Sequence, residues 1–355
     1  MRVAVAMSGG VDSSVAAALL ADEGYEVIGL SMQLYDQREG EIRFGRCCTL
    51  DDLHDARRVA ARLGLPHYIV NFESHFHAQV VDNFVSEYVS GRTPIPCTRC
   101  NSEVKFATLV DRVRGLDAQF LATGHYVRVE LDETTRQYRL LRGRDARRDQ
   151  SYFLFSLTQA QLAHARFPVG HLTKVDVRAI ARERGLPVAD KPDSQEICFV
   201  SSGNHATFVE RHAADRTPTP GVIADVHGRT LGRHEGIHRF TVGQRKGLGL
   251  ATGAPLYVVA IDAHANEVVV GDRAALARPT LTASAVNWIA GVTPPEPLRA
   301  RVQIRHGHHP APATVTPIDA RRAQVDFDEP QAAIAPGQAA VFYAGDMVLG
   351  GGWIE

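Results

Sequence analysis

The stretch Ala6-Met7-Ser8-Gly9-Gly10-Val11-Asp12-Ser13-Ser14 decides the fold of this chain. The apolar run 3–6 before it predicts a buried strand, and the apolar residues at helical spacing after it predict a helix that stops near Gly24. Glycines at such a junction let backbone N–H groups approach an anion, and the start of the helix adds positive potential. The serines of the stretch add hydroxyl donors, so we expect a phosphate-binding loop.

This loop differs from two common phosphate-binding motifs. The lysine of a Walker A loop is missing at the required spacing, and so is the G-x-G-x-x-G spacing of a dinucleotide-binding fingerprint. The string from Ser8 to Ser14 instead resembles the PP-loop of ATP pyrophosphatases, which cleave ATP between the α and β phosphates. An ordinary glycine turn before a helix is the alternative interpretation, and the complete string disfavours it.

The length, composition and charge of the chain restrict the classes of protein to which it can belong. The chain has 355 residues, 45% of them apolar, which is enough for two or three domains. Its 39 Lys and Arg balance 40 Asp and Glu, so any nucleic-acid surface must be local. It shows neither the long apolar region of a signal peptide nor an apolar run of transmembrane length, so we expect a cytoplasmic protein without membrane contact, and a monomer.

The N-terminal third alternates strand and helix patterns. Strands are predicted at 27–32, 67–70 and 119–122, and helices at 51–63, 80–88 and 103–113. Beyond this alternation, a further helix is predicted at 173–184. Repeated β-α units predict an α/β fold with a doubly wound parallel sheet that binds ligands at the carboxyl ends of its strands. The glycine loop and Gly124-His125 both follow such ends.

The pattern changes beyond about residue 205. Glycine, proline and short strand-like runs, such as 257–261 and 268–270, replace the long helices. From about 282 onward, short strands separated by turns predict a small antiparallel β-barrel. We therefore expect a catalytic domain at 1–204, a small central domain at 205–280 and a C-terminal β-barrel at 281–355.

The five cysteines are too few and too unevenly spaced for a disulfide framework. Cys97 and Cys100 form a Cys-x-x-Cys just before a predicted helix, where Arg99 and the helix start favour thiolate. Taken alone, this pair is compatible with three interpretations: a redox pair, half of a zinc site, or two core cysteines. The sequence contains no second Cys-x-x-Cys that would complete a zinc site. Cys198 lies in a polar, proline-containing loop, which favours a functional role. Cys47-Cys48 is interpreted as buried packing.

Basic residues cluster in three places, at 142–148, 233–246 and 299–309. Any one cluster is typical of a solvated surface. Three of them outside the ATP-binding region indicate a footprint for the phosphate backbone of a nucleic acid.

Together these segments resemble the bacterial tRNA-specific 2-thiouridylase family, within the PP-loop ATP pyrophosphatase superfamily. The resemblance spans essentially the whole chain. Its motifs are 8–14, 45–48, 91–101, 123–126, 149–154, 191–199, 240–249 and the terminal 337–354. It implies a PP-loop domain, a small central domain and a C-terminal barrel, and an enzyme that replaces the C2 oxygen of the wobble uridine (position 34) of tRNA by sulfur.

The resemblance also implies site residues. ATP, with Mg²⁺, would be bound by Ala6, Met7, Ser8, Gly9, Gly10, Val11, Asp12, Ser13, Met32 and Gly124. Cys198 would form a persulfide with Cys100 as its catalytic partner. Attack of Cys100 on the bridging sulfur would release sulfide near the activated carbon or leave a Cys100–Cys198 disulfide. The tRNA would contact Ile95, Pro96, Cys97, His125, Arg148, Asp149, Gln150, Arg305, His306 and Gln338. The implied partners are tRNAs for glutamate, glutamine and lysine, and a protein that donates persulfide sulfur.

Two positions depart from the family pattern. Many members have aspartate, assigned as the general base, where this chain has Cys97, and lysine is usual where this chain has Arg148. Cys97 as a thiolate is one candidate base. The alternative is a [4Fe-4S] cluster held by Cys97, Cys100 and Cys198, with one iron open for sulfide. Another PP-loop adenylating synthetase and a non-enzymatic tRNA-binding protein are the remaining functional hypotheses.

Overall fold

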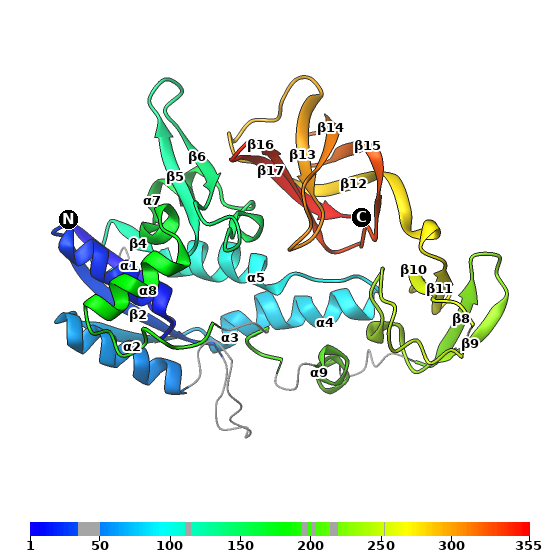
Figure 1. The fold of residues 1–355 in the computed structure, drawn as a ribbon, viewed down its shortest axis with the longest axis horizontal. Coiled ribbons are helices and arrows are strands. Elements are labelled where there is room, and N and C mark those ends of the chain that lie inside the picture. The colour runs from blue at the N-terminus through cyan, green and yellow to red at the C-terminus, as the bar shows by residue number, and fades with distance from the viewer. Residues whose placement is uncertain (35–49, 111–114, 194–196, 201–203, 214–218, 252) are drawn as a thin grey trace.

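The computed structural model describes residues 1–355 except 35–49, 111–114, 194–196, 201–203, 214–218 and 252. The expected packing of Cys47 and Cys48 lies outside the described residues. Within them, the chain forms a five-stranded, a four-stranded and an eight-stranded sheet. Figure 1 shows the five-stranded sheet with its helices on the left, the β-barrel at the top and the four-stranded sheet on the right.

The N-terminal part is a parallel sheet with the strand order β3-β2-β1-β4-β7. Its strands are β1 (Arg2–Ala6), β2 (Glu26–Gln33), β3 (His67–Asn71), β4 (Phe120–Ala122) and β7 (Ala165–Arg166). The chain adds β2 and β3 on one side of β1 and then β4 on the other. The loop after β1 therefore lies at the crossover point where such sheets bind ligands. The predicted doubly wound α/β fold is confirmed.

Helices cover both faces of this sheet because β1 alternates its side chains between two cores. Val3 and Val5 share one core with α1 (Val11–Asp22), α2 (Leu50–Leu63) and α8 (Lys174–Glu183). Ala4 belongs to the other core, on the opposite face. The helical segments of that core are α3 (Glu73–Phe76), η1 (His77–Val81), α4 (Asp82–Val89), η2 (Cys100–Leu109) and α7 (Gln159–His164).

The helix that contains two cysteines begins earlier than the sequence predicted. We expected it to start at about Glu103, but α5 (Pro96–Arg99) runs directly into η2. Pro96 takes the first helical position, where its fixed φ suits a helix and its missing N–H is not needed. Cys97 and Cys100 therefore lie inside the helix, and the prediction that they precede it was wrong.

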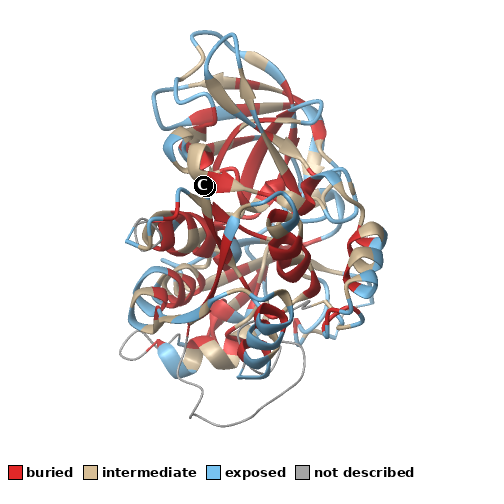
Figure 2. Cartoon of the chain, turned by 90° about the vertical axis from the view of Figure 1, so that its left-hand side faces the viewer, coloured by how far each residue is buried: buried red, intermediate tan, exposed pale blue. Residues whose placement is uncertain are grey.

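The C-terminal part is a closed antiparallel barrel, as predicted. Its strands are β12 (Ala277–Trp288), β13 (Leu298–Gln303), β14 (Ala311–Pro317), β15 (Ala323–Ala332), β16 (Ala339–Ala344) and β17 (Met347–Ile354). β12 pairs with both β15 and β17, which closes the sheet on itself. Figure 2 shows buried residues concentrated in the barrel interior and along the parallel sheet.

A hairpin from the N-terminal part extends the sheet of the barrel. Its strands are β5 (Val127–Asp132) and β6 (Gln137–Arg142), and β6 pairs with β17 through Leu141↔Met347 and Leu140↔Val348. The sequence did not predict this pairing. It fixes the loop after β6 against the barrel.

The central part is a four-stranded sheet with the order β10-β11-β8-β9. Its elements are α9 (His205–His212), β8 (Gly221–Asp225), β9 (Thr230–His234), η6 (Ile237–Arg239), β10 (Tyr257–Asp262), β11 (Glu267–Gly271) and η7 (Ala274–Leu276). The predicted strands near 257–261 and 268–270 are confirmed. The ring of Tyr88 in α4 stacks on His205 with centroids 4.5 Å apart, which ties this part to the parallel sheet.

Among the described residues, no helix combines the length and the apolar character that crossing a membrane requires.

Candidate active site

The loop after β1 is closely enclosed by backbone. Gly9 has a φ of +72°, and a Cβ on it would lie 2.2 Å from the carbonyl oxygen of Asp52. A Cβ on Gly124, which follows β4, would lie 2.5 Å from the backbone nitrogen of Ser13. Only glycine fits at these two positions, so the chain after β4 packs directly on the first turn of α1.

Hydrogen bonds hold this loop in one shape. The N–H of Ser8 donates to Oγ of Ser13 at 3.2 Å, and the hydroxyls of Ser13 and Ser14 donate to the carbonyl oxygen of Gly10 at 3.2 and 2.8 Å. Gly10 is the N-cap of α1 and has no side chain to cap the helix. The first N–H groups of α1 therefore point into a site suited to a phosphate.

The expected ATP-binding residues come together because β1, β2 and β4 are neighbours. Ala6 pairs with Leu30 of β2, and the N–H of Met7 donates to the carbonyl oxygen of Leu30 at 2.7 Å. Met32 is buried two residues further along β2, while Gly124 contacts the start of α1 from the other side. The described residues thus form one continuous edge that can hold a nucleotide.

Two lysines that sequence reasoning missed stabilise this edge. Nζ of Lys174 lies 2.8 Å from Oδ1 of Asp12 and 2.7 Å from Oδ1 of Asp193, and the lysine is only 8% exposed. The phenol of Tyr126 donates to the same oxygen of Asp12 at 2.6 Å. Burial raises the pKa of Tyr126, and Asp12 adds to the increase. This cluster connects the glycine loop with the segment that leads to Cys198.

The second lysine, Lys191, fixes the other side of the loop. Its Nζ donates to the carbonyl oxygen of Gly9 at 3.1 Å and lies 2.7 Å from Asp52 and 2.6 Å from Asp55. Burial opposes its charge, but the two carboxylates dominate and raise its pKa. Lys191 stands in the 191–199 motif, which was the signal that could have found it. Lys174 had a weaker signal, its place at the start of the helix predicted at 173–184, which Thr173 caps in the structure.

The three described cysteines differ in exposure. Cys97 is exposed, Cys100 is 9% exposed, and Cys198 is half-buried in a turn. Phe199 anchors that turn, because its ring packs edge-on against Phe76 at 5.6 Å and Phe84 at 5.1 Å.

All three described cysteines are thiols, so the Cys100–Cys198 disulfide is not a cross-link of this structure. Nor do they converge as metal ligands: the described residues contain no set of three His, Cys, Asp or Glu side chains that could hold a metal ion. We therefore derive no step through the predicted [4Fe-4S] cluster.

The expected tRNA residues fall into two groups. On the parallel-sheet side, Ile95 and Pro96 are buried. Nδ1 of His125 lies 2.7 Å from Oγ1 of Thr123, and burial, with Lys105 nearby, lowers the pKa of His125 well below its ordinary value. His125 is therefore neutral at physiological pH.

An ion pair and several hydrogen bonds hold the segment 148–150 in place. Arg148 pairs with Asp193 at 2.8 Å, and the side chain of Gln150 accepts from the N–H of Tyr126 at 2.9 Å. Asp149 accepts from the N–H of Gly143 and of Ser151, each at 3.1 Å. Arg148 is 46% exposed on its side chain and remains accessible, whereas Asp149 shapes the loop.

On the barrel side, Gln338 contacts the segment just before the helix of the two cysteines, and His306 contacts Phe153, which is bonded to that helix. Nε2 of Gln338 donates to the carbonyl oxygen of Thr93 at 3.0 Å, three residues before Pro96. The ring of His306 packs on Phe153 at 4.8 Å, and Asn101, next to Cys100, donates to the carbonyl oxygen of Phe153 at 3.3 Å. Arg305 is exposed beside His306.

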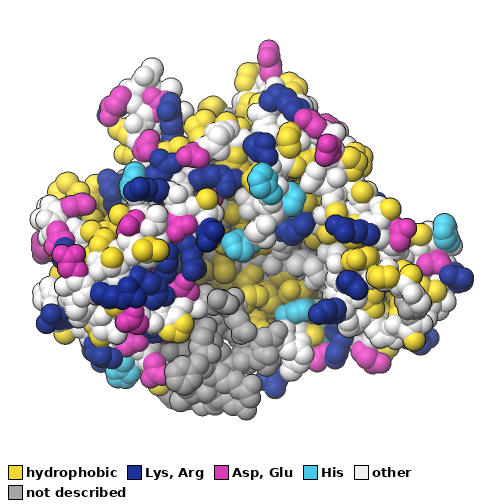
Figure 3. Space-filling model, in the orientation of Figure 1, with side chains coloured by type: hydrophobic (Ala, Val, Ile, Leu, Met, Phe, Trp, Pro, Cys, Tyr) yellow, Lys and Arg dark blue, Asp and Glu magenta, His cyan; other side chains and the backbone are white. Residues whose placement is uncertain are grey.

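The barrel and the parallel sheet therefore meet at the start of the cysteine helix. Figure 3 shows Lys and Arg side chains gathered around a hollow between these two parts. The surface is positive where a polyanion could lie across both parts.

A glycine loop at the crossover of a parallel sheet, followed by a small sheet and a barrel, defines a PP-loop type of nucleotide-binding protein. Family models match three segments: a "tRNA methyl transferase HUP domain" at residues 1–202, a "tRNA methyl transferase PRC-barrel domain" at 206–272 and an "Aminomethyltransferase beta-barrel domain" at 278–354.

Similar proteins named tRNA-specific 2-thiouridylase MnmA come from several bacteria. The chain is 55% identical to that of Solibacter usitatus, covering 99% of both chains. It is 54% identical to that of Geotalea uraniireducens, covering 100% of this chain and 95% of the relative, and 53% identical to that of Geobacter metallireducens, covering 100% and 96%. The chain belongs to the tRNA-specific 2-thiouridylase family.

Proposed function

We propose that this protein is a tRNA 2-thiouridylase, which uses ATP to replace the C2 oxygen of the wobble uridine by sulfur. The observation that supports it most is the junction at the cysteine helix, where Gln338 bonds to Thr93 and His306 packs on Phe153. A barrel with a purely structural role would not be expected to contact the segments beside the candidate active site. In this proposal residues 1–204 catalyse, 205–280 link the two ends and 281–355 hold tRNA.

The first step activates the uridine. A urea-like C2 carbonyl is a poor electrophile, so its oxygen attacks the α phosphate of ATP while the N3 proton leaves. An oxygen–phosphorus bond forms, the bond between the α and β phosphates breaks, and pyrophosphate departs towards the N–H groups at 8–13. Asp12 and the ATP phosphates are the ligands that Mg²⁺ would use, and the ion would offset the phosphate charge. We assign the N3 proton to the Cys97 thiolate.

The second step transfers sulfur. A donor protein first loads Cys198 as a persulfide, whose terminal sulfur attacks C2 and expels AMP. The Cys100 thiolate then attacks Sγ of Cys198, breaks the sulfur–sulfur bond to the base and leaves a transient Cys100–Cys198 disulfide. N3 regains its proton from Cys97, giving 2-thiouridine. An external thiol reduces the disulfide before the next turnover.

The separate steps provide the test. We expect Cys198→Ser to release pyrophosphate when unmodified tRNA and ATP are present, and to form no 2-thiouridine. Cys97→Asp is expected to retain thiolation, because a carboxylate replaces the thiolate as base. Nucleotide cleavage that does not depend on tRNA would favour another PP-loop synthetase, and tRNA binding without cleavage would favour a non-enzymatic binding protein.

The sulfur route has its own test. Anaerobically purified protein is assayed for iron and acid-labile sulfide before thiolation is measured. We expect iron-free protein to thiolate tRNA with a persulfide donor. Activity that tracks iron content would replace the persulfide relay with the cluster alternative.

A further inference from the structure

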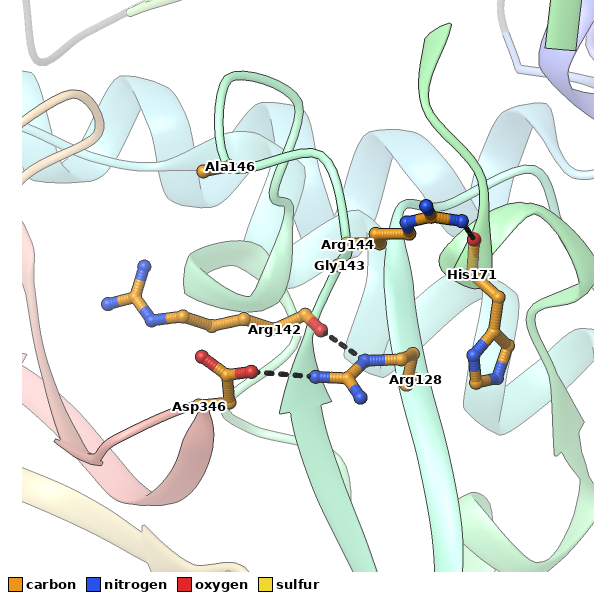
Figure 4. A pocket seen from close by; sticks show the side chains of 7 residues that line it. All are labelled: Arg128, Arg142, Gly143, Arg144, Ala146, His171 and Asp346. Carbon is orange, nitrogen blue, oxygen red and sulfur yellow. Dashed lines mark hydrogen bonds and ion pairs between the residues drawn. The ribbon is translucent and has the colours of Figure 1, made fainter. Parts of the chain in front are cut away.

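An arginine-lined pocket lies apart from the glycine loop, where the hairpin β5–β6 meets the turn between β16 and β17. Its volume is about 330 Å³, and its lining residues are Arg128, Arg142, Gly143, Arg144, Ala146, His171 and Asp346. Figure 4 shows Arg128 at the centre of the group, paired with Asp346 on one side, with Arg144 and His171 on the other.

The basic side chains of this pocket are held in place. Nε of Arg128 donates to the carbonyl oxygen of Arg142 at 2.9 Å, and its Nη2 lies 2.9 Å from Oδ2 of Asp346. Arg144 donates from Nη1 to the carbonyl oxygen of His171 at 3.3 Å. Arg142 is paired with Asp149 at 3.0 Å, and Arg128 is paired with Asp346 at 2.9 Å and lies 3.7 Å from Glu130. Arg144 donates to a carbonyl oxygen instead, so its guanidinium supplies the positive charge of the pocket. Fixed guanidinium groups bind phosphate oxygens well.

The backbone around the pocket is equally constrained. A Cβ on Gly143 would lie 2.5 Å from the carbonyl oxygen of Tyr126, and one on Gly170 would lie 1.8 Å from that of Val127. The N–H of Arg144 donates to the carbonyl oxygen of Gly170 at 2.9 Å. The pocket is thus part of a packed framework that presents its arginines in a fixed arrangement.

The same short loop connects this pocket to the active site. Asp149 accepts from the N–H of Gly143, which joins the two ends of the segment from Gly143 to Asp149. Within the segment, Asp145 accepts from the N–H of Lys174 at 3.0 Å, which ties it to the start of α8. Arg144 stands four residues before Arg148, which pairs with Asp193 beside the glycine loop. A polyanion held in the pocket would therefore have a set position relative to the catalytic loop.

We propose that this pocket binds one backbone phosphate of the tRNA, between Arg128, Arg144 and His171; the proposal rests on the thiouridylase function above. The lining favours a backbone phosphate over a nucleotide, because it offers no large apolar side chain and no aromatic ring other than His171 to hold a base. Asp346 is the counterion of Arg128 in the absence of RNA, and the phosphate takes its place. The contact orients the tRNA and carries no sequence information.

The test measures tRNA affinity at several salt concentrations for the full-length protein. Arg144→Gln is expected to weaken tRNA binding about tenfold. The plot of log binding constant against log salt concentration should become less steep by about 0.9, which corresponds to the loss of one phosphate contact. Asp346→Asn removes the competing charge, so it is expected to tighten binding several-fold. The matched control is Arg136→Gln, at the exposed tip of the same hairpin in an ion pair with Glu133, and it should change neither value.

Ethylation interference identifies the phosphate. One ethylated position of the tRNA should weaken binding to the unaltered protein and have no effect on the Arg144→Gln variant. Equal effects of Arg144→Gln and Arg136→Gln would overturn the proposal, and so would a changed KM for ATP with unchanged tRNA affinity. If the unaltered protein thiolates tRNA and these variants behave alike, the pocket assignment fails while the proposed function stands. If the unaltered protein does not bind tRNA, both fail.

Discussion

Replacing Lys174 tests the charge arrangement around the glycine loop. Its ammonium lies between Asp12 and Asp193, and it is only 8% exposed. Lys174→Met leaves the two carboxylates facing each other at no more than about 5.5 Å, the sum of the two Nζ–oxygen distances of 2.8 and 2.7 Å. At an effective dielectric of about 20, their repulsion is about 3 kcal/mol. Removing one partner of a buried ion pair typically costs about 3–5 kcal/mol, so we expect a loss of about 3 kcal/mol in unfolding free energy.

The pH dependence of this loss follows from the same charges. Burial raises the pKa of Asp193 but Lys174 and neighbouring arginines outweigh it, so its pKa in the native protein is lowered. A carboxyl group with a lowered pKa stabilises the native state above its unfolded pKa and loses this effect only as pH falls through the lower native value. The unaltered protein therefore keeps this contribution between pH 5 and 8. In Lys174→Met, the loss of the ammonium raises the pKa of Asp193 relative to the unaltered protein, so protonation relieves the repulsion and the loss shrinks as pH falls.

The assay is urea unfolding followed by circular dichroism at pH 8 and pH 5. Arg182→Met is the matched control, because it removes an exposed ion pair with Asp190 from the same helix and should change stability by less than about 0.5 kcal/mol. A loss below about 1 kcal/mol for Lys174→Met at pH 8, or an equal loss at both pH values, would refute the reasoning.

Three further predictions concern other parts of the site. Phe199→Ala removes a buried ring that packs on Phe76, Phe84 and Phe208, so we expect a loss of about 3–5 kcal/mol and faster alkylation of the Cys198 thiol; an unchanged alkylation rate would contradict the anchoring role. Gly124→Ala puts a methyl group against the first turn of α1, so KM for ATP should rise at least about tenfold, whereas Gly253→Ala, in open space, should leave KM unchanged. His125, whose pKa is lowered, binds protons more readily when unfolded, so stability should fall as pH drops below about 6.5. His125→Asn should flatten that fall, and an unaltered slope would show that other groups cause it.

The parallel sheet could be predicted because its signals are local. The run 3–6, the glycines after it and the helical spacing of apolar residues all lie within one short stretch, and each agrees with the others. The alternation of Val3, Ala4 and Val5 between two cores follows directly from the strand period. The barrel was predictable for a similar reason, since short strands and turns repeat along the C-terminal part.

The connection between the barrel and the N-terminal part could not be predicted in this way. Leu141 pairs with Met347 across about two hundred residues, and no local pattern specifies a partner at such a distance. The early start of the cysteine helix was missed for a different reason. The sequence pattern placed Cys97 and Cys100 before the helix, although Pro96 suits the first helical position and marks the earlier start.

The ion pairs in the site could not be predicted from the sequence either. Lys174 and Lys191 meet their aspartates only after the helices pack, so their spacing along the chain does not mark them as partners. The sequence predicts that Arg148 contacts RNA. In the structure Arg148 also pairs with Asp193, which supports the segment before Cys198. Basic clusters in a sequence therefore predict a surface better than they predict individual contacts.

The most direct test of the central claim is the sulfur content of the tRNA product. Unmodified tRNA for glutamate, glutamine or lysine is incubated with the protein, ATP and a persulfide donor, then digested and analysed by mass spectrometry. We predict 2-thiouridine at position 34 only, with one AMP and one pyrophosphate formed for each thiolated tRNA. Thiolation without ATP, or ATP cleavage that yields no 2-thiouridine under these conditions, would contradict the proposed function.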